Sequence, residues 1–442
     1  MKIRNIILAL AGMSAMFSCS LEEYPYGFYS EGNFYKTAAD AEAAVNYIYD
    51  AINYIEYSRS IVFLGDMNTD VMNPKGDATA ANKELDGWKL NNLNTNTTLG
   101  NFFKYSYITI NRANSVIRNV GAMTSLDEDL RNRYVGEAYF MRGWSYFCLA
   151  RNFGMVPIHT EPVTTLDQSA VPAAKSLDEM WSCIISDLEK AAELLPLYSV
   201  PEAGRADKAA ACGFLAKAYL YIASAKDHGA PQYSQMNFDV DSYYAKAAEY
   251  AAKVVDNPEQ TTYGFVDNLL DIYDVEKPDG AENIFIMSMD RTGESEGQYS
   301  KISKMYIPYI SGAAVYLRQG DSESFIKTHD GWGEYRTDLD FYASFESGDR
   351  RHDWLFCNEV YDAGGNVVAS IADGKLNYPF CRKFIDPNFA GDKTSTRPFL
   401  LRYSDVALIY AEAAGPTEKA YELVNYIRNR ANLGELAPSL GK

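Results

Sequence analysis

One loop of the sequence places a tryptophan among amides and a carboxylate, a composition that suits carbohydrate recognition. The segment DGWKLNNLN, residues 86–94, holds Trp88 and Asn94, and Asp70 precedes it in the same polar stretch. Sugar recognition uses flat aromatic faces against pyranose C–H groups, with Asp, Asn and Arg for the hydroxyls. We therefore predict Trp88, Asp70 and Asn94 as ligand contacts, while Asp70 has the alternative role of capping a turn.

A second loop has the same character. In HDGWGEYR, residues 329–336, Trp332 stands between two glycines, and Tyr335 and Arg336 follow it. A tryptophan among glycines and charged residues has no obvious apolar partner, so we predict Trp332, Tyr335 and Arg336 as ligand contacts. For both loops the alternative is that the tryptophan folds back to anchor its own loop, since loops carry binding sites but also need fixing.

Signatures of catalysis are weak. The segment 293–297 matches the G-x-S-x-G pattern of serine hydrolases, but glutamates flank Ser295 and would oppose an oxyanion, and no helix of small residues follows. The four histidines stand apart and show no metal-ligand spacing. We therefore predict no enzymatic activity, no catalytic residue, no cofactor and no metal. A glycosidase pair of carboxylates stays open, because only its separation in space identifies it.

Composition limits the remaining classes of function. The chain has 442 residues, 47% of them hydrophobic, and a net charge of −18. That charge repels nucleic acids and anionic lipid surfaces. Cys357 and Cys381 bracket a predicted hairpin, and whether they pair depends on geometry that a sequence does not give.

The N-terminus has the features of an export signal. Lys2 and Arg4 precede an apolar run, residues 6–17, that is too short to span a bilayer and ends at Ser18 and Cys19. This end resembles a loose lipobox, which makes residues 1–18 a lipoprotein signal peptide and Cys19 the predicted site of lipid attachment. The acidic stretch that follows resembles the surface-export tag of Bacteroidetes-type lipoproteins. An ordinary signal peptide with an incidental cysteine is the alternative.

The elements that would position these loops are mostly helices. The stretch 134–157 is apolar almost all round, which predicts a helix surrounded by others; Gly154 and Pro157 end it. Sequences resembling capping boxes begin helices at Thr37, Ser125 and Ser176.

Two pairs of helices have the character of a repeat: 208–225 with 242–255, and 401–414 with 417–432. The last helix keeps the spacing of a tetratricopeptide second helix, while the loop 226–241 is longer than a regular array allows. Residues 61–64 are predicted as extended and residues 66–99 as loop. From 257 to about 400 the pattern breaks into loops and short strand candidates (283–289, 359–361 and 366–370). We predict a mainly α fold of tetratricopeptide-like helix pairs, at about 37–256 and 401–432, that form a curved scaffold for an irregular ligand-binding region.

Several segments, in order along almost the whole chain, resemble the SusD/RagB family of outer-membrane nutrient-binding lipoproteins. They include NFYKTAADAEAAVNYIYDAI (33–52), GEAYFMRGWSYFCLARNFGMVPI (136–158), GRADKAAACGFLAKAYLYIA (204–223), FESGDRRHDWLF (345–356) and RPFLLRYSDVALIYAEAAG (397–415). Family members usually continue beyond the last helix pair, so the resemblance implies that the family's C-terminal segment is missing and that residues 19–442 form a single SusD-like domain.

This resemblance implies a role for the whole protein. The helical scaffold would grip a TonB-dependent (SusC-like) transporter, and the opposite loops would hold an extracellular glycan and deliver it. The protein would sit on the outer face of the outer membrane, attached only through its N-terminal lipid, and would not bind nucleic acid. A peptide-binding member of the family and a scaffold without ligand are the alternatives.

Overall fold

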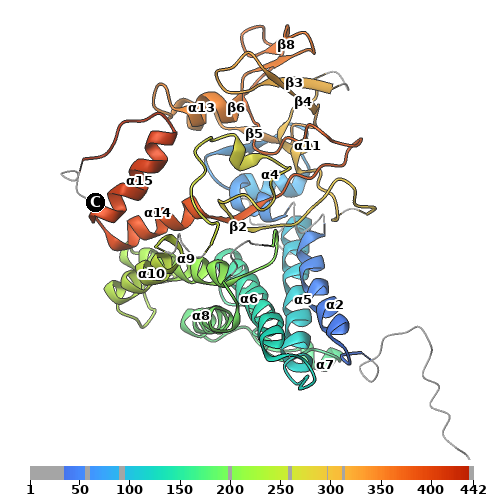
Figure 1. Ribbon diagram of the computed structural model, residues 1–442, viewed down its shortest axis with the longest axis vertical. Coiled ribbons are helices and arrows are strands. Elements are labelled where there is room, and N and C mark those ends of the chain that lie inside the picture. Colours follow the sequence, from blue (N-terminus) through green and yellow to red (C-terminus); the bar gives the residue numbers. More distant parts are fainter. Residues whose placement is uncertain are drawn as a thin grey trace, which may run out of the picture.

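The computed structural model describes residues 34–54, 60–88, 95–197, 202–256, 261–295, 297–310 and 314–437. The predictions for the signal peptide, Cys19 and Asn94 lie outside these residues. Long helices form one side of the molecule, and short strands and loops form the other (Figure 1). The long helices are α2 (Ala38–Asn53), α5 (Thr97–Asn119), α6 (Glu128–Phe153), α8 (Leu177–Leu194), α9 (Lys208–Asp227), α10 (Val240–Val255), α14 (Tyr403–Ala414) and α15 (Glu418–Arg430).

These helices pack against one another in a row. Helix α5 lies between α2 and α6, α6 packs on α8, α8 on α9, α9 on α10, and α14 joins α10 to α15. The predicted tetratricopeptide-like, mainly α scaffold is therefore confirmed. Each helix alone is amphipathic or apolar and needs its neighbours to cover it.

Helix α6 is the centre of this scaffold, as its apolar sequence predicts. It ends at Phe153, and Gly154 follows with φ +71°, a conformation that favours glycine. Its start differs from the prediction: the N-cap is Asp127, whose carboxylate accepts from the N–H groups of Asp129 and Leu130 at 3.1 and 3.2 Å. An aspartate at this position competes well with Ser125, because its charge also favours the positive end of the helix dipole.

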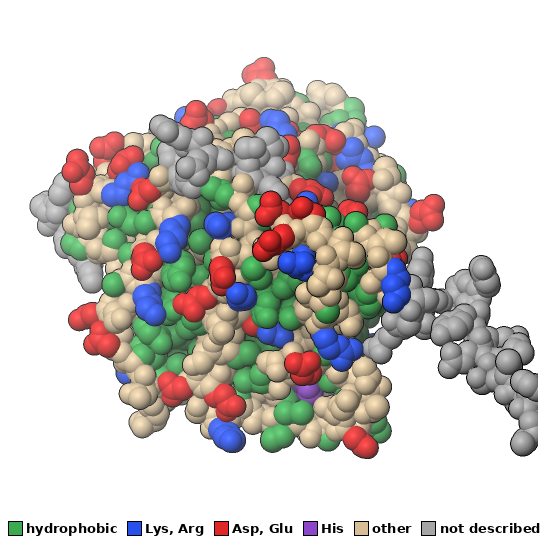
Figure 2. All heavy atoms as spheres, turned by 60° about the horizontal axis from the view of Figure 1, so that its bottom comes forward, with side chains coloured by type: hydrophobic (Ala, Val, Ile, Leu, Met, Phe, Trp, Pro, Cys, Tyr) green, Lys and Arg blue, Asp and Glu red, His purple; other side chains and the backbone are tan. Residues whose placement is uncertain are grey.

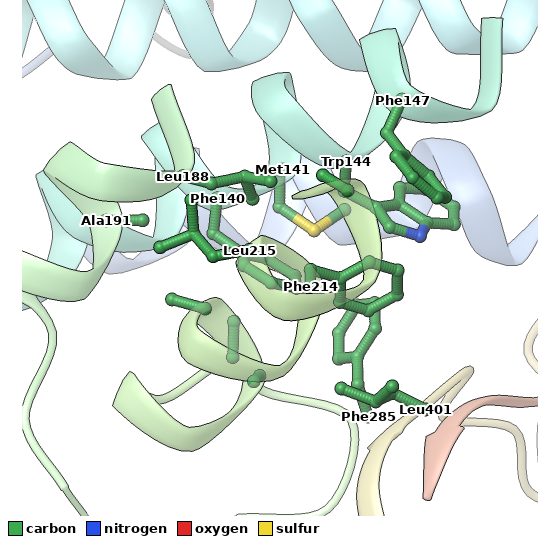
Figure 3. Packing of buried hydrophobic residues seen from close by; sticks show 14 of the residues in the cluster. Phe140, Met141, Trp144, Phe147, Leu188, Ala191, Phe214, Leu215, Phe285 and Leu401 are labelled. Atoms are coloured by element: carbon green, nitrogen blue, oxygen red, sulfur yellow. The ribbon is translucent and has the colours of Figure 1, made fainter. Parts of the chain in front are cut away.

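The core joins the two sides of the molecule. Phe140 and Trp144 of α6 meet Phe214 of α9 (Figure 3). Phe285 enters the same cluster from strand β2 (Asn283–Ile286), and its ring centre lies 4.9 Å from that of Phe140. Leu401, from the paired strand β10 (Phe399–Arg402), is also fully buried there. The β2–β10 ribbon thus attaches the strand-rich region to the helices.

The strand-rich region consists of small antiparallel sheets. Strands β4, β3, β7 and β8 form one sheet in that order, and β1 pairs with β5 and β6 with β9. Their bounds are β1 (Met72–Pro74), β3 (Ala314–Arg318), β4 (Phe325–His329), β5 (Tyr335–Thr337), β6 (Phe356–Cys357), β7 (Glu359–Tyr361), β8 (Val367–Ser370) and β9 (Phe380–Cys381). Short helical pieces complete it: η1 (Phe63–Met67), α4 (Ala80–Asp86), α7 (Leu166–Ser169), η3 (Asp271–Tyr273), α11 (Ile302–Tyr306), α12 (Leu339–Ala343) and α13 (Arg350–Leu355).

Two local predictions are wrong. Residues 61–64 are helical, the last two of them within the π-helix η1, although four apolar residues in a row are compatible with a strand. The stretch 66–99, predicted as loop, contains β1, α4 and the start of α5. Helix α4 is a short polar helix with a threonine cap, Thr79, which explains why no hydrophobic period revealed it.

The two cysteines of the predicted hairpin do not pair. Cys357 lies opposite Phe380, and Cys381 lies opposite Phe356. Because neighbouring residues of a strand point to opposite faces, the two thiols face different sides of the β6–β9 pair. Both cysteines are free in the structure.

Candidate ligand-binding site

Two exposed aromatic residues lie on segments of the strand-rich region that are hydrogen-bonded to each other. Trp332 lies in the loop between β4 and β5 and is 37% exposed, and Tyr309 follows α11 and is 71% exposed. We call these two residues the aromatic ledge. Tyr309 was not predicted, because nothing in the sequence distinguishes it from the other tyrosines among the 34 in the chain.

Backbone hydrogen bonds fix the two segments to each other. The N–H of Trp332 donates to the carbonyl of Lys304 at 2.7 Å, and the N–H of Gly331 donates to Pro308 at 3.1 Å. On the other side of the ring, the N–H of Gly333 donates to Ile307 at 3.0 Å. The position of the Trp332 backbone relative to α11 is thus determined by three main-chain contacts.

The glycines on both sides of Trp332 are required by this arrangement. A Cβ atom on Gly331 would lie 2.0 Å from the carbonyl oxygen of Ile307, well inside contact distance. Gly333 has φ +57°, and a Cβ there would lie 2.5 Å from the hydroxyl of Tyr378. The GWG sequence therefore allows the loop to lie directly on the segment that carries Tyr309.

A buried histidine supports the ledge from below. His329 Nδ1 lies 2.8 Å from the carbonyl of Asp330, and its Nε2 lies 2.9 Å from Ser303 Oγ. Burial lowers the pKa of His329 and favours the neutral ring. Nδ1 then carries the proton and donates to Asp330, so Nε2 accepts from Ser303. Ser303 itself is fully buried, so this serine–histidine pair does not present a nucleophile to a substrate.

Charged groups border the ledge. Lys304 Nζ lies 5.7 Å from the centre of the Trp332 ring and forms an ion pair with Asp392. The hydrogen bond from Lys304 lowers the pKa of Asp392, so this carboxylate is ionised and half-exposed beside the rings. These groups offer a donor and an acceptor next to an apolar surface.

Trp88 belongs to the same part of the molecule. It follows the last residues of α4 with φ +50°, and 63% of its surface is exposed. Helix α4 packs on β1, and β1 pairs with β5 directly after the Trp332 loop (Figure 1). The ion pair between Lys75 and Glu334, at 2.7 Å, reinforces this connection. Asp70 is exposed in the turn that precedes β1.

The prediction for Tyr335 is corrected by its burial. Only 2% of its surface is exposed, and its ring meets Phe63 and Tyr306 edge-on at 4.6 and 4.9 Å. It is the first residue of a strand whose pleat turns it inward, away from Trp332. Arg336 is half-buried and lies 5.0 Å from the ring centre of Tyr378, the residue whose hydroxyl packs beside Gly333. Arg336 thus lies behind the Trp332 loop.

No group of residues suited to a metal ion occurs in the described part of the chain. Nor does any described helix combine the length and apolar character needed to cross a membrane.

Two family models match this chain. One, described as "Starch-binding associating with outer membrane", matches residues 29–220, and the other, the SusD family, matches residues 327–440, which include the Trp332 loop and the last helix pair. Together they match more than two thirds of the chain. The chain belongs to the SusD/RagB-like family.

Relatives within the SusD/RagB-like family match over nearly the full chain. SusD-like protein P2 of Formosa agariphila is 26% identical over 98% of this chain and 82% of its own length. Among solved structures, a laminarin binding SusD-like protein is 20% identical, with a TM-score of 0.72 over 90% of this chain and 85% of its own. Surface glycan-binding protein A from Bacteroides thetaiotaomicron, in complex with laminarihexaose, is 19% identical, with a TM-score of 0.69 over 91% and 85%. These structures share the SusD fold described above.

Proposed function

We propose that the protein binds an extracellular glycan at the aromatic ledge, without altering it chemically. The observation that carries this proposal is the pair of exposed rings, Trp332 and Tyr309, on two segments that three main-chain hydrogen bonds hold together. Rings held in this way stack on the C–H face of a sugar without losing much conformational freedom on binding. The adjacent Lys304 and Asp392 offer hydrogen bonds to hydroxyl groups.

The relatives support this choice of ligand. Two solved SusD-like structures carry names that state laminarin or glycan binding, and one family model is described as starch-binding. We further propose that the protein lies on the outer face of the outer membrane, attached through Cys19, and passes the glycan to a TonB-dependent transporter of the SusC type. The outer-membrane association of the matched family supports this location.

Isothermal titration against soluble polysaccharides, starch and laminarin among them, tests the site. We expect Trp88→Ala combined with Trp332→Ala to weaken binding of the preferred glycan at least tenfold, and Tyr309→Ala to weaken it as well, because each change removes a stacking face. Tyr47→Ala is the matched control, since Tyr47 is an equally exposed ring, 57%, on the helical scaffold. Unchanged affinity in the double variant would refute the ledge as the glycan site.

A parallel titration with oligopeptides separates glycan from peptide cargo. Binding of peptides and not of glycans at the ledge would favour a peptide-binding member of the family, and binding of neither would favour a scaffold. Incubation with the preferred polysaccharide should release no new reducing ends; their appearance would contradict binding without catalysis.

A further inference from the structure

A large cavity in the helical scaffold lies apart from the aromatic ledge. It measures about 1310 Å³ and lies between the C-terminal end of α6, the N-terminal end of α8, and helices α9 and α14. All these elements belong to the helical side, whereas the ledge belongs to the strand-rich side (Figure 1). Figure 2 brings the helical side forward and shows apolar side chains gathered in patches between charged ones.

A lysine in the wall of this cavity has no hydrogen-bonding or ionic partner in the described part of the chain. Lys217, in the middle of α9, is mostly buried, and it forms no hydrogen bond or ion pair with any described residue. Its Nζ lies 5.7 Å from the centre of the Phe214 ring. Burial lowers the pKa of Lys217, which shows that the ammonium group is costly in this place. A buried cation without a partner indicates a site that an anion completes.

Two charged groups of the cavity wall act on Lys217, the cation Arg151 and the anion Asp405. Arg151 packs over the rings of Phe147 and Tyr221, at 5.5 and 5.2 Å, and forms no ion pair with a described carboxylate. Asp405 is the acidic group that raises the pKa of Lys217, but its carboxylate already accepts from the guanidinium and the N–H of Arg402 at 3.2 and 2.9 Å.

Two further carboxylates, those of Asp178 and Glu412, line the cavity together with Lys175. Asp178 already accepts from the N–H of Asn237 at 2.9 Å. The lining holds three basic residues against three acidic ones, so its charge is balanced in a chain of net charge −18, and Lys217 and Arg151 form no ion pair with a described carboxylate.

The remaining lining suits a peptide. Leu220 and Leu408 provide apolar surface, and 44% of Leu408 is exposed. Gln232 and Gln235 lie on the rim, where their amides can bond a peptide main chain. The volume exceeds the 300–1,000 Å³ or so of small-molecule sites, and extended grooves of helix-pair scaffolds commonly hold extended segments.

We propose that this cavity is a docking site for an extended acidic peptide segment of a partner protein. One carboxylate of the segment lies between Lys217 and Arg151, and a neighbouring apolar side chain packs on Leu220 and Leu408. The site is independent of the proposed glycan function, because none of its lining residues belongs to the ledge.

Titration calorimetry with a blocked hexapeptide of alternating leucine and glutamate tests this proposal. We expect it to bind at least tenfold more tightly than the counterpart with glutamine in place of glutamate, and more weakly as salt is raised. Lys217→Met should abolish the preference for glutamate. Lys190→Met is the matched control, because Lys190 lies on α8 in an exposed ion pair with Glu193. Trp332→Ala should leave peptide binding unchanged.

Arg151→Gln provides a second test at a solvent-exposed position, and it decides the question if Lys217→Met lowers the melting temperature too far for titration. Loss of the preference for glutamate in either folded variant supports the site. Equal binding of the two peptides, no binding of either, or an unchanged preference in every folded variant would overturn it.

Discussion

At the scale of single residues, the Trp332 loop depends on the protonation state of the imidazole beneath it. Neutral His329 accepts from Ser303 and donates to Asp330, and these bonds join the end of β4 to α11. A protonated ring has no acceptor for the Ser303 hydroxyl. Burial has the largest effect on the pKa of His329 and lowers it. Of the charged groups that face the ring, Lys304 also lowers this pKa, while Asp392 and Asp330 raise it.

This arrangement predicts a pH dependence of stability. The pKa of His329 is lower in the folded protein than in the unfolded chain, where histidine titrates near about 6.5. Below that pH the unfolded state binds more protons, so the contribution of His329 is fully present above about pH 7 and is lost as the pH falls. We expect His329→Gln to reduce the difference in unfolding free energy between pH 7 and pH 5, measured by urea denaturation. An identical difference in both proteins would contradict this role.

At this scale, the sequence predicted the exposure of Trp332 but not the burial of Tyr335. The glycines around Trp332 indicated an exposed ring, because a packed tryptophan usually has apolar neighbours in sequence. Tyr335 was predicted wrongly because the pattern did not show that β5 begins there and turns this ring inward. Tyr309 could not be predicted, since its position beside Trp332 arises from main-chain bonds between segments about 20 residues apart.

At the scale of elements, a buried arginine joins three helices. Arg142 of α6 forms two bonds with Asp187 of α8, at 2.8 and 2.6 Å, and donates to Asn114 of α5 at 2.7 Å. Both members of the ion pair are almost fully buried. The guanidinium therefore fixes the relative position of α5, α6 and α8.

We expect Asp187→Ala to lower the unfolding free energy by about 3–5 kcal/mol, because it leaves the Arg142 charge buried without its partner. Glu193→Ala, which removes an exposed ion pair of the same helix, should cost less than about 1 kcal/mol. Urea denaturation of both variants measures the difference. Equal losses of unfolding free energy in the two variants would show that the buried ion pair of Asp187 contributes no more than the exposed pair of Glu193.

The long helices were predictable because their apolar residues recur with the helical period, as in α2 and α10. Short elements were not. Helix α4 is polar and has no hydrophobic period. Strands β3 and β4 pair over five residues, but their sequences have no strong alternation of apolar and polar residues. Such elements depend on tertiary contacts, which a periodicity does not contain.

At the scale of the whole molecule, the proposed location depends on a residue outside the described part of the chain. We expect Cys19→Ala to release the protein from membranes in cell fractionation, because the lipid would have no attachment point. Cys183→Ala, a change of a half-buried thiol on α8, should leave the protein membrane-bound. Continued membrane association of the Cys19 variant would contradict lipid attachment.

The β2–β10 ribbon has a consequence for any attempt to shorten the protein. Phe285 and Leu401 come from the two ends of the strand-rich region, yet both side chains lie among those of α6 and α9. Deleting residues between about 257 and 400 would remove the Phe285 strand and leave its partner unpaired, which would expose apolar helix surface and favour aggregation. A minimal version of this protein must keep the ribbon, even if the loops that carry Trp88 and Trp332 are discarded.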